Sequence, residues 1–265
     1  MNSTTYTTYL DLLHAELRPA MGCTEPIAIA YAAAKARQVL ASMPHSLEIH
    51  LSGNVIKNVK AVSIPNSQGL KGIESAAILG MVGGDSDAGL EVIANVTDAD
   101  LSETRRLLEA GICSCHHAID VPLLYIKLTA KRDESEVTVV IEDSHTNITR
   151  ITKDGRDLLV DQRYRDDSKP TAAALSVAEI LDFANTVRIE DVKPLLERQI
   201  LYNDGIADEG FCGTWGASVG RSLLANYDRG DVRIRARARA AAASDARMGG
   251  CAMPVVINSG SGNQG

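Results

Sequence analysis

The pattern of apolar positions predicts helices toward both ends of the chain, with strands between them. Leucines recur at helical spacing over residues 5–18, and an alanine-rich stretch over about 26–42 predicts a second helix. Residues 46–52 alternate between apolar and polar positions, as a half-buried strand does. The stretch 55–64 partly continues this strand pattern, whereas the small residues of 72–81 favour a short helix.

The middle of the chain has the pattern of a small antiparallel meander, and the remainder is mostly helical. Residues 163–170 are charged and end in Pro170, which is typical of a linker. Four short apolar runs separated by turn residues make up the expected meander: 123–131, 136–142, 147–152 and 157–161. Helices are expected to begin at Ser176 and to cover 190–201, 217–227 and 231–247.

This order of elements predicts an α+β fold, namely an Ala/Gly-rich helical bundle with a small antiparallel β meander. Aromatic residues make up only 4% of the 265 residues, so the core is expected to consist of Ala, Val, Leu and Ile. Three parts are expected: an N-terminal α/β portion (1–120), the β meander (121–170) and a helical portion (171–265).

Charge and composition narrow the functional class. A formal net charge of −7 argues against nucleic acid or an anionic membrane surface as the partner. No apolar run reaches the roughly 20 residues that a membrane span needs, and the polar first residues show no secretory signal. Five cysteines, an odd number, fit a reducing, cytoplasmic setting better than a disulfide framework.

The most informative polar position is Cys23, within the sequence Gly22-Cys23-Thr24-Glu25-Pro26. Pro26 suits the first position of a helix, so Cys23 is expected to lie at the N-terminus of that helix. There the positive end of the helix dipole favours a thiolate, which binds a metal ion or acts as a nucleophile. The alternative is a small buried apolar residue, because free cysteines are often buried.

A second candidate site is the glycine- and serine-rich segment 258–265, which follows an apolar run at 255–257. Its backbone N–H groups, together with serine and asparagine donors, suit a small anion such as a carboxylate. Gly260, Gly262 and Gly265 also match the spacing of a dinucleotide-binding fingerprint, which requires a following helix. A glycine-rich turn without a ligand is the third interpretation.

Three further groups have competing interpretations. Arg247 can hold a substrate carboxylate or pair with Asp245, and His145, between two expected strands, is either structural or functional. Residues 113–117 (CSCHH) are of metal-binding types, but their spacing is awkward for four ligands on one zinc ion. The alternating arginines of 233–239 suggest RNA contact or, in a net acidic chain without interleaved aromatic residues, a solvated face.

Taken together, these segments resemble the L-cysteine desulfidase family, which is related to the alpha chain of bacterial iron–sulfur L-serine dehydratases. The resemblance runs in order from about residue 10 to the end, and its most specific motifs are SDARMGG and NSGSGNQG. Its segments are 22–26 (GCTEP), 52–58 (SGNVIKN), 64–66 (IPN), 145–148 (HTNI), 244–250 (SDARMGG) and 258–265 (NSGSGNQG).

The resemblance implies an oxygen-sensitive [4Fe-4S] cluster, held by three thiolates, with one iron open as a Lewis acid. L-cysteine would be split into pyruvate, ammonia and sulfide by αβ-elimination without pyridoxal phosphate (PLP); an L-serine dehydratase alpha-like chain is the alternative. Cys23 matches the family's cluster cysteine, and Cys251 lies where a second ligand is expected. Lys57 is the expected base or charge partner, the alternative being a solvated lysine. The residues expected to line the substrate pocket are Asn54, His145, Thr146, Asn147, Arg247, Ser259, Gly260, Ser261, Gly262, Asn263 and Gln264.

Members of the family extend well beyond the terminal motif and carry at least one cluster cysteine there, so an incomplete ligand set is expected within these residues. Three hypotheses follow: a lyase with a missing C-terminal portion, a domain whose site a partner chain completes, and a dinucleotide-dependent oxidoreductase. The expected ligand is a small amino acid, L-cysteine or L-serine, and a homo-oligomer is the alternative assembly. The first two hypotheses depend on one geometric expectation, that Cys23 and the terminal loop face the same cavity.

Overall fold

A six-stranded mixed sheet, in the order β3-β2-β4-β5-β6-β7, organises the first 160 residues. The computed structural model describes residues 2–160, 175–258, 260–262 and 264–265. The strands are β2 (Ser46–Ser52), β3 (Cys113–Ala118), β4 (Tyr125–Arg132), β5 (Ser135–Glu142), β6 (Ile148–Lys153) and β7 (Arg156–Val160). Strands β2 and β3 run parallel, and all other neighbours are antiparallel. The expected meander is confirmed as β4–β7, but it belongs to a larger sheet.

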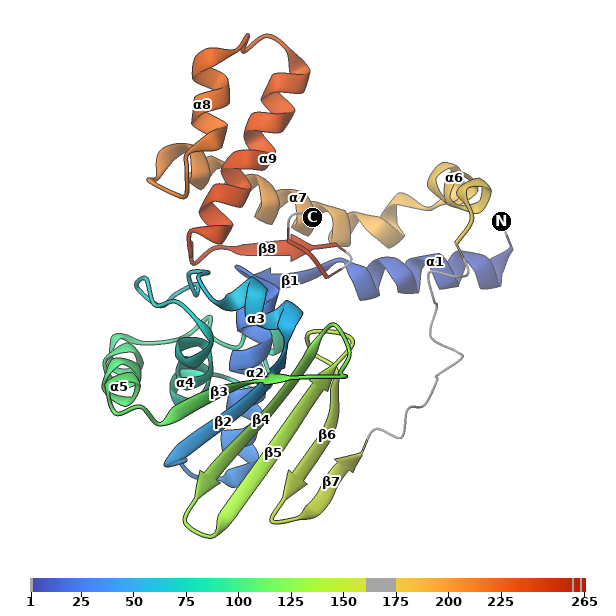
Figure 1. Cartoon of the computed structure of the whole chain (residues 1–265). Helices are drawn as coiled ribbons and strands as arrows, with labels where there is room; N and C mark the ends of the chain where they lie inside the picture. Colours follow the sequence, from blue (N-terminus) through green and yellow to red (C-terminus); the bar gives the residue numbers. More distant parts are fainter. Residues whose placement is uncertain (1, 161–174, 259, 263) are drawn as a thin grey trace.

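Helices cover one face of this sheet (Figure 1). They are α2 (Thr24–Leu40), α4 (Ile73–Gly83) and α5 (Asp98–Glu109), and a short 3-10 helix spans Gly89–Glu91. Helix α2 packs against β4, β5 and α4. A Cβ added at Gly80 in α4 would collide with the backbone of Ala30 in α2, so these two helices touch backbone to backbone. The α+β class and the close packing of small residues are both as expected.

The stretch 55–64 is the clearest error of the sequence-based prediction, because it begins as helix α3 (Gly53–Val59) rather than as a strand. The Ser52 hydroxyl accepts a hydrogen bond from the Val55 N–H and caps the helix. Val55 and Val59 are buried four residues apart, so one face of a helix buries both. The β-branched residues that suggested a strand therefore serve a helix here.

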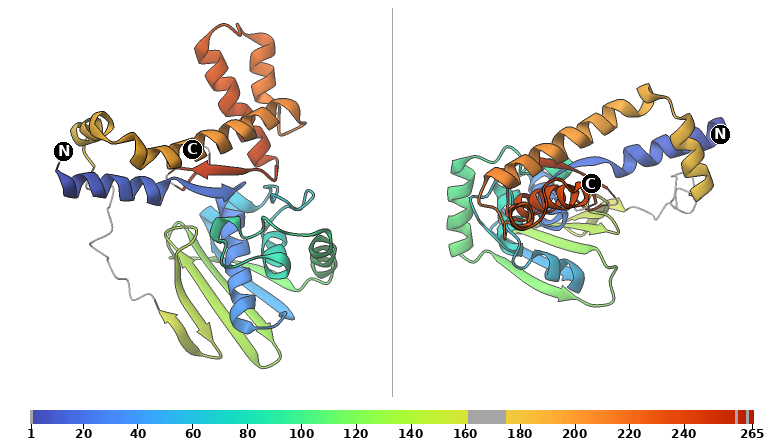
Figure 2. Two further views of the ribbon diagram at one scale, coloured as in Figure 1. Left: turned by 180° about the vertical axis from the view of Figure 1, so that it is seen from behind. Right: turned by 90° about the horizontal axis from the view of Figure 1, so that it is seen from above.

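The remaining helices lie above the sheet and form a second region (Figures 1 and 2). They are α1 (Ser3–Glu16), α6 (Val177–Thr186), α7 (Ile189–Cys212), α8 (Val219–Asn226) and α9 (Val232–Met248). Helices α1, α6 and part of α7 extend to one side as an arm, whereas α8 and α9 form a hairpin. Strand β1 (Arg18–Met21), which the sequence did not predict, pairs antiparallel with β8 (Pro254–Ile257).

The β1–β8 pair joins the beginning of the chain to its last residues. Because β1 leads directly into α2, this pairing brings the terminal segment to the N-terminus of α2. The expected linker at 163–170 lies outside the described residues. The division into parts at residues 120 and 170 stays a prediction.

Candidate functional site

The turn between β1 and α2 places Cys23 at the N-terminus of a helix, as the sequence suggested. Gly22 has φ +55°, and a Cβ there would lie 2.7 Å from Pro65 Cγ, so the turn requires glycine. Cys23 is the N-cap residue of α2, and its side chain makes no capping hydrogen bond. Because the helix begins at Thr24, Pro26 occupies the third helical position and not the first.

The Cys23 thiol is buried against two residues from the end of α9. Its side chain is 6% exposed, and Sγ lies 3.0 Å from Met248 Sδ and 3.7 Å from Arg247 Nη1. Burial raises the pKa of this thiol, Arg247 partly offsets the rise, and Glu25 adds to it. The shift is opposite to the one expected from the helix N-terminus alone, because loss of hydration outweighs the favourable charges.

Arg247 connects the Cys23 turn to the terminal loop. Its side chain is 5% exposed, and Nη1 donates a hydrogen bond of 3.1 Å to the Gly22 carbonyl oxygen. A Cβ added at Gly262 would lie 2.8 Å from Arg247 Cδ and 2.9 Å from Nε, so the loop packs directly on this side chain. The guanidinium therefore lies where the two sequence motifs meet.

A second contact between the motifs runs through Thr24, which sequence analysis did not select. Thr24 Oγ1 donates to the Gly260 carbonyl oxygen at 3.3 Å. Beside it, Asn58 Nδ2 in α3 donates to Glu25 Oε1 at 2.9 Å. Thr24, Glu25 and Asn58 all lie inside motifs that carry the resemblance, and this was the available signal for them. The structure brings GCTEP, the SGNVIKN segment and the terminal loop into one region.

His145 approaches the terminal loop from the turn between β5 and β6. A Cβ added at Gly260 would lie 3.8 Å from His145 Nδ1 and Cε1. Nε2 is buried and has no hydrogen-bond partner among the residues that the structure describes. Burial lowers the pKa of His145, the charge of Glu25 opposes this, and Arg18 adds to it. Burial therefore favours the neutral form of the imidazole.

The remaining predicted pocket residues, on α3 and in the turn between β5 and β6, make no hydrogen bond to Arg247 or the Cys23 turn that the structure records in its described part. Asn147 Nδ2 donates to the Glu142 carbonyl oxygen at 3.0 Å, so this side chain holds its own turn, and Thr146 lies half-buried in the same turn. Asn54 and Lys57 are exposed on α3. Their roles toward a substrate stay predictions.

The terminal loop is a tight turn. The Ser261 N–H donates to the Asn258 carbonyl oxygen at 2.9 Å, and the Asn258 N–H donates back to Ser261 at 3.1 Å. The Gln264 side chain is exposed. Ser259 and Asn263, two predicted substrate-binding residues, lie outside the described residues. The Ser261 N–H is thus used within the turn, and the backbone at Gly262 lies directly beside Arg247.

Cys251, the second predicted cluster ligand, lies in the hydrophobic core. It is 3% exposed, and burial raises the pKa of its thiol. Across the described ranges, no three His, Cys, Asp or Glu side chains form a group that could hold a metal ion. Since a [4Fe-4S] cluster with one open iron takes three thiolates, the described residues do not fit a complete cluster site.

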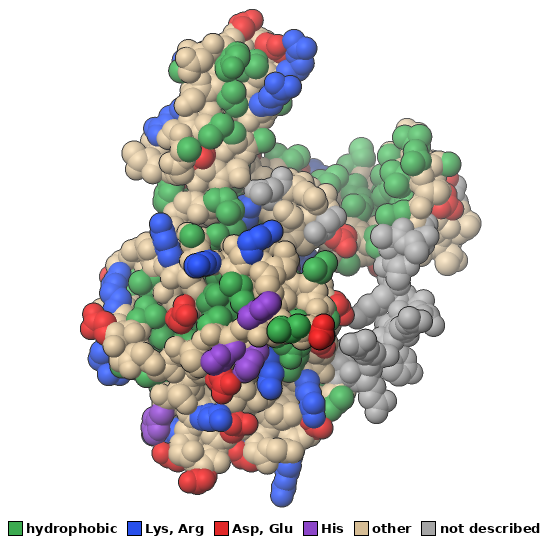
Figure 3. Space-filling view, viewed as in Figure 1, with side chains coloured by type: hydrophobic (Ala, Val, Ile, Leu, Met, Phe, Trp, Pro, Cys, Tyr) green, Lys and Arg blue, Asp and Glu red, His purple; other side chains and the backbone are tan. Residues whose placement is uncertain are grey.

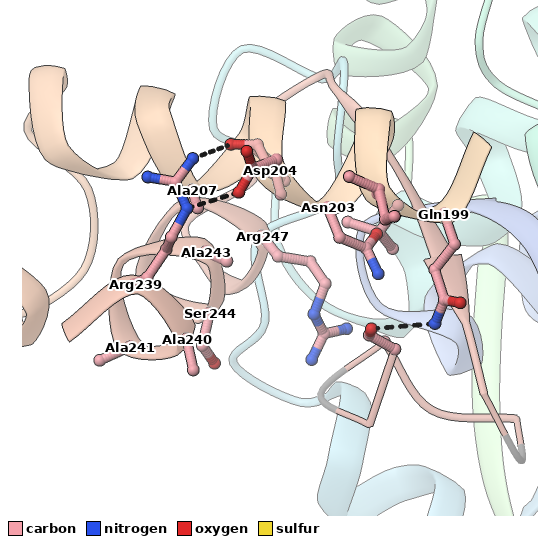
Figure 4. Close-up of a pocket in the computed structure, with 15 residues that line it drawn as sticks. Gln199, Asn203, Asp204, Ala207, Arg239, Ala240, Ala241, Ala243, Ser244 and Arg247 are labelled. Atoms are coloured by element: carbon pink, nitrogen blue, oxygen red, sulfur yellow. Dashed lines mark hydrogen bonds and ion pairs between the residues drawn. The ribbon is translucent and has the colours of Figure 1, made fainter. Parts of the chain in front are cut away.

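A pocket of about 590 Å³ lies beside Arg247, between α7 and α9 (Figure 4). Arg247 points into it from α9, and Gln199 Nε2 donates to the Gly265 carbonyl oxygen at its edge. At the other end of the pocket, Arg239 pairs with Asp204 and, at 3.0 Å, with Asp208. The pocket combines an apolar alanine wall with one buried cation.

The structure does not favour a zinc site at residues 113–117, a dinucleotide site at the terminal glycines or an RNA contact at the arginines of 233–239. In residues 113–117 of β3, the side chains alternate between the two faces of the sheet, and burial raises the pKa of Cys113 to about 12. Strand β8 pairs antiparallel with β1, whereas a dinucleotide fingerprint follows a strand of a parallel βαβ unit. In the 233–239 series, Arg233 and Arg239 pair with carboxylates, as on a solvated face.

No helix in the part of the chain that the structure describes is long and apolar enough to cross a membrane.

Comparison with known proteins adds a family assignment. A family model described as "Serine dehydratase alpha chain" matches residues 87–265. A UPF0597 protein of Lachnoclostridium phytofermentans is 52% identical over 261 residues, which cover 98% of this chain and 62% of the relative. A UPF0597 protein of Finegoldia magna is 47% identical over 259 residues, 97% of this chain and 62% of the relative. The chain thus spans about three fifths of the length of these relatives, and no solved structure matches it.

Proposed function

The chain belongs to the serine dehydratase alpha chain family, and from this premise we propose that it supplies the substrate-carboxylate site and one cluster thiolate of a lyase. The proposed substrate is L-cysteine, on the resemblance of GCTEP, SDARMGG and NSGSGNQG to the cysteine desulfidases, and L-serine is the alternative. The observation that carries the proposal is the position of Arg247, between the Cys23 turn and the Gly260–Gly262 loop.

In this proposal, Arg247 holds the carboxylate of the amino acid. A guanidinium presents two parallel N–H donors that match the two oxygens of a carboxylate. Because Arg247 is buried, its charge acts in a medium of lower effective dielectric than water, which strengthens the attraction. The Gly260 and Gly262 N–H groups are proposed as additional donors for the same anion, whereas the Ser261 N–H already donates to the Asn258 carbonyl oxygen.

The reaction proposed is an αβ-elimination. A base takes the proton from Cα, the electron pair forms a Cα=Cβ double bond, and the Cβ–S bond breaks to release sulfide. The resulting aminoacrylate tautomerises to an imine, which water hydrolyses to pyruvate and ammonia. His145 is proposed as the base, because burial favours its neutral imidazole, which can accept a proton. Lys57, exposed on α3, is proposed as a charge partner.

We propose Cys23 as one thiolate ligand of the [4Fe-4S] cluster. Its place at a helix N-terminus next to Arg247 suits an anionic ligand. Cys251 stays the predicted second ligand, and further ligands are proposed to come from the part of the family's length that lies outside the match, since the described residues assemble no set of three. No reaction step is derived through the cluster for that reason.

The carboxylate site is tested on the chain itself by isothermal titration with L-cysteine and L-serine. Arg247→Gln should weaken binding about tenfold or more, the worth of a hydrogen bond to a charged group. Arg235→Gln removes an exposed arginine of the same helix and should leave binding unchanged. The methyl ester of L-serine, which lacks the carboxylate, should not bind. The proposal would be contradicted if L-serine and its methyl ester bound equally well, or if Arg247→Gln and Arg235→Gln bound L-cysteine equally well.

A further inference from the structure

Helix α7 presents an apolar face that the proposed site does not use. Ile189, Leu196 and Ile200 are all exposed, and their spacing of seven and four residues places them on one side of the helix. The Ile200 side chain is 66% exposed. The residues that α7 buries, including Val192 and Leu195, belong to a neighbouring side.

This face continues in both directions along the molecule. At its C-terminal end it enters the pocket between α7 and α9, because Ile200 and Ala207 both line that pocket. At its N-terminal end it meets α6, where Val177 and Leu181 are exposed one helical turn apart. Figure 3 shows hydrophobic side chains gathered over this arm of the molecule.

We propose that the α7 face, defined as Ile189, Leu196, Ile200 and the adjoining pocket, docks an amphipathic segment from the part of the serine dehydratase alpha chain relatives that lies outside the match to these residues. About two fifths of each relative's length lies outside the match. Apolar side chains at this spacing, beside a groove, are the usual contact surface for an amphipathic helix. This inference rests on the proposed function, which requires further cluster ligands from the same source.

The location of the face agrees with that role. Arg247 and Gly262 form part of the pocket wall, so a docked segment would lie next to the proposed carboxylate site. Monomeric proteins rarely leave large contiguous apolar patches exposed, because burial of that surface is favourable. The Asp204–Arg239 pair at the far end of the pocket already satisfies its own charges. Lys193 and Glu197, which pair with each other, lie on or beside the same side of α7. The docked segment therefore needs apolar side chains opposite the three apolar residues of the α7 face.

The test uses the unmatched part of the Lachnoclostridium phytofermentans relative, co-expressed with this chain. We expect a one-to-one complex on size-exclusion chromatography with light scattering. Ile200→Asp should raise the Kd of that complex about tenfold or more, because a charge replaces an apolar contact. Leu158→Asp, at a residue 59% exposed on β7, is the matched control and should leave the Kd unchanged.

A second measurement covers the case in which the unmatched part does not fold alone. An Asp placed at the aligned position of the intact relative should lower its Tm clearly, whereas Ile200→Asp in this chain should not. Equal small effects in both proteins would overturn the proposal. A homodimer of this chain that Ile200→Asp dissociates would assign the face to a second copy and would also overturn it.

Docking and the proposed function can fail separately. A complex that binds L-cysteine but shows no visible iron–sulfur absorption after anaerobic reconstitution supports docking and contradicts the role of Cys23. In the opposite case, this chain binds L-cysteine but forms no complex, and the Asp substitution does not change the Tm of the intact relative. That result contradicts docking and leaves the proposed carboxylate site in place.

Discussion

Replacement of Gly262 by alanine should displace Arg247 without removing its charge. An added Cβ would lie 2.8 Å from Cδ, 2.9 Å from Nε and 3.0 Å from Nη1 of Arg247. Ordinary carbon–carbon contacts begin at about 3.5 Å, so the side chain must withdraw by roughly 0.7 Å. Nη1 lies 3.1 Å from the Gly22 carbonyl oxygen, and a shift of that size away from it breaks the hydrogen bond.

The expected cost falls mainly on ligand binding. A hydrogen bond to a charged group contributes about 1.5–3 kcal/mol, so a guanidinium out of position should weaken L-cysteine binding roughly 10- to 100-fold. The free energy of unfolding should fall by only about 1 kcal/mol, because the atoms that must move belong to a flexible side chain. Isothermal titration and urea denaturation measure the two effects separately.

Gly205→Ala is the control for this substitution. Gly205 lies inside α7, and an added Cβ would meet only the terminal methyl of Met253 at 3.3 Å. This variant should bind L-cysteine normally and gain about 0.5–1 kcal/mol from helix propensity. If Gly262→Ala binds as tightly as Gly205→Ala, then Arg247 does not hold the carboxylate in the way proposed.

Substitutions at three further positions test the fold and its pH dependence. Gly80→Ala should lower the free energy of unfolding by about 2 kcal/mol in urea denaturation, because its Cβ meets the backbone of α2, which cannot give way; a neutral result would mean that α2 and α4 are farther apart. Thr97→Ala removes the capping box of α5 and should cost about 1 kcal/mol by the same assay, whereas Thr97→Ser should cost little. His145 has a lowered pKa when folded, so the unfolded chain binds its proton first and the free energy of unfolding should decline as pH falls below about 6.5. That decline should be smaller in His145→Asn when unfolding is compared at about pH 7.5 and pH 5.5, and an identical pH profile would contradict a buried neutral imidazole.

Local patterns predicted most strands of the sheet because short apolar runs are bounded by turn residues, whereas β3 was not predicted. β2 and β4–β6 were all expected near their observed bounds. β1 was missed since it has four residues and its partner β8 lies more than 230 positions away, so nothing nearby in the sequence signals the pairing. α3 was misread because apolar residues at 55 and 59 suit either element until the Ser52 cap is known.

The position of Cys23 was predictable, but its chemistry was not. The glycine before it and the proline after it indicate a turn into a helix, and the structure has that turn. Burial sets the upward direction of its pKa shift and Arg247 opposes it. Part of that burial comes from Met248, which, like Arg247, lies on a helix more than 200 residues away. The contacts of Glu25 with Asn58 were missed for the same reason, because the partners lie on separate elements.

Arg247 lines the α7 pocket and is the centre of the proposed carboxylate site, so the two proposed ligands should be coupled. Its Nη1 contacts the Cys23 turn, while the same side chain lines the pocket between α7 and α9. A segment docked in the pocket would exclude water from one side of the guanidinium and so strengthen its attraction for a carboxylate. Coupling between two binding sites is reciprocal. If docking raises the affinity for L-cysteine by a given factor, L-cysteine must raise the affinity for the docked segment by the same factor. Titration of each ligand in the presence and absence of the other measures both factors. In Arg247→Gln, each ligand should bind with the same affinity whether or not the other is present.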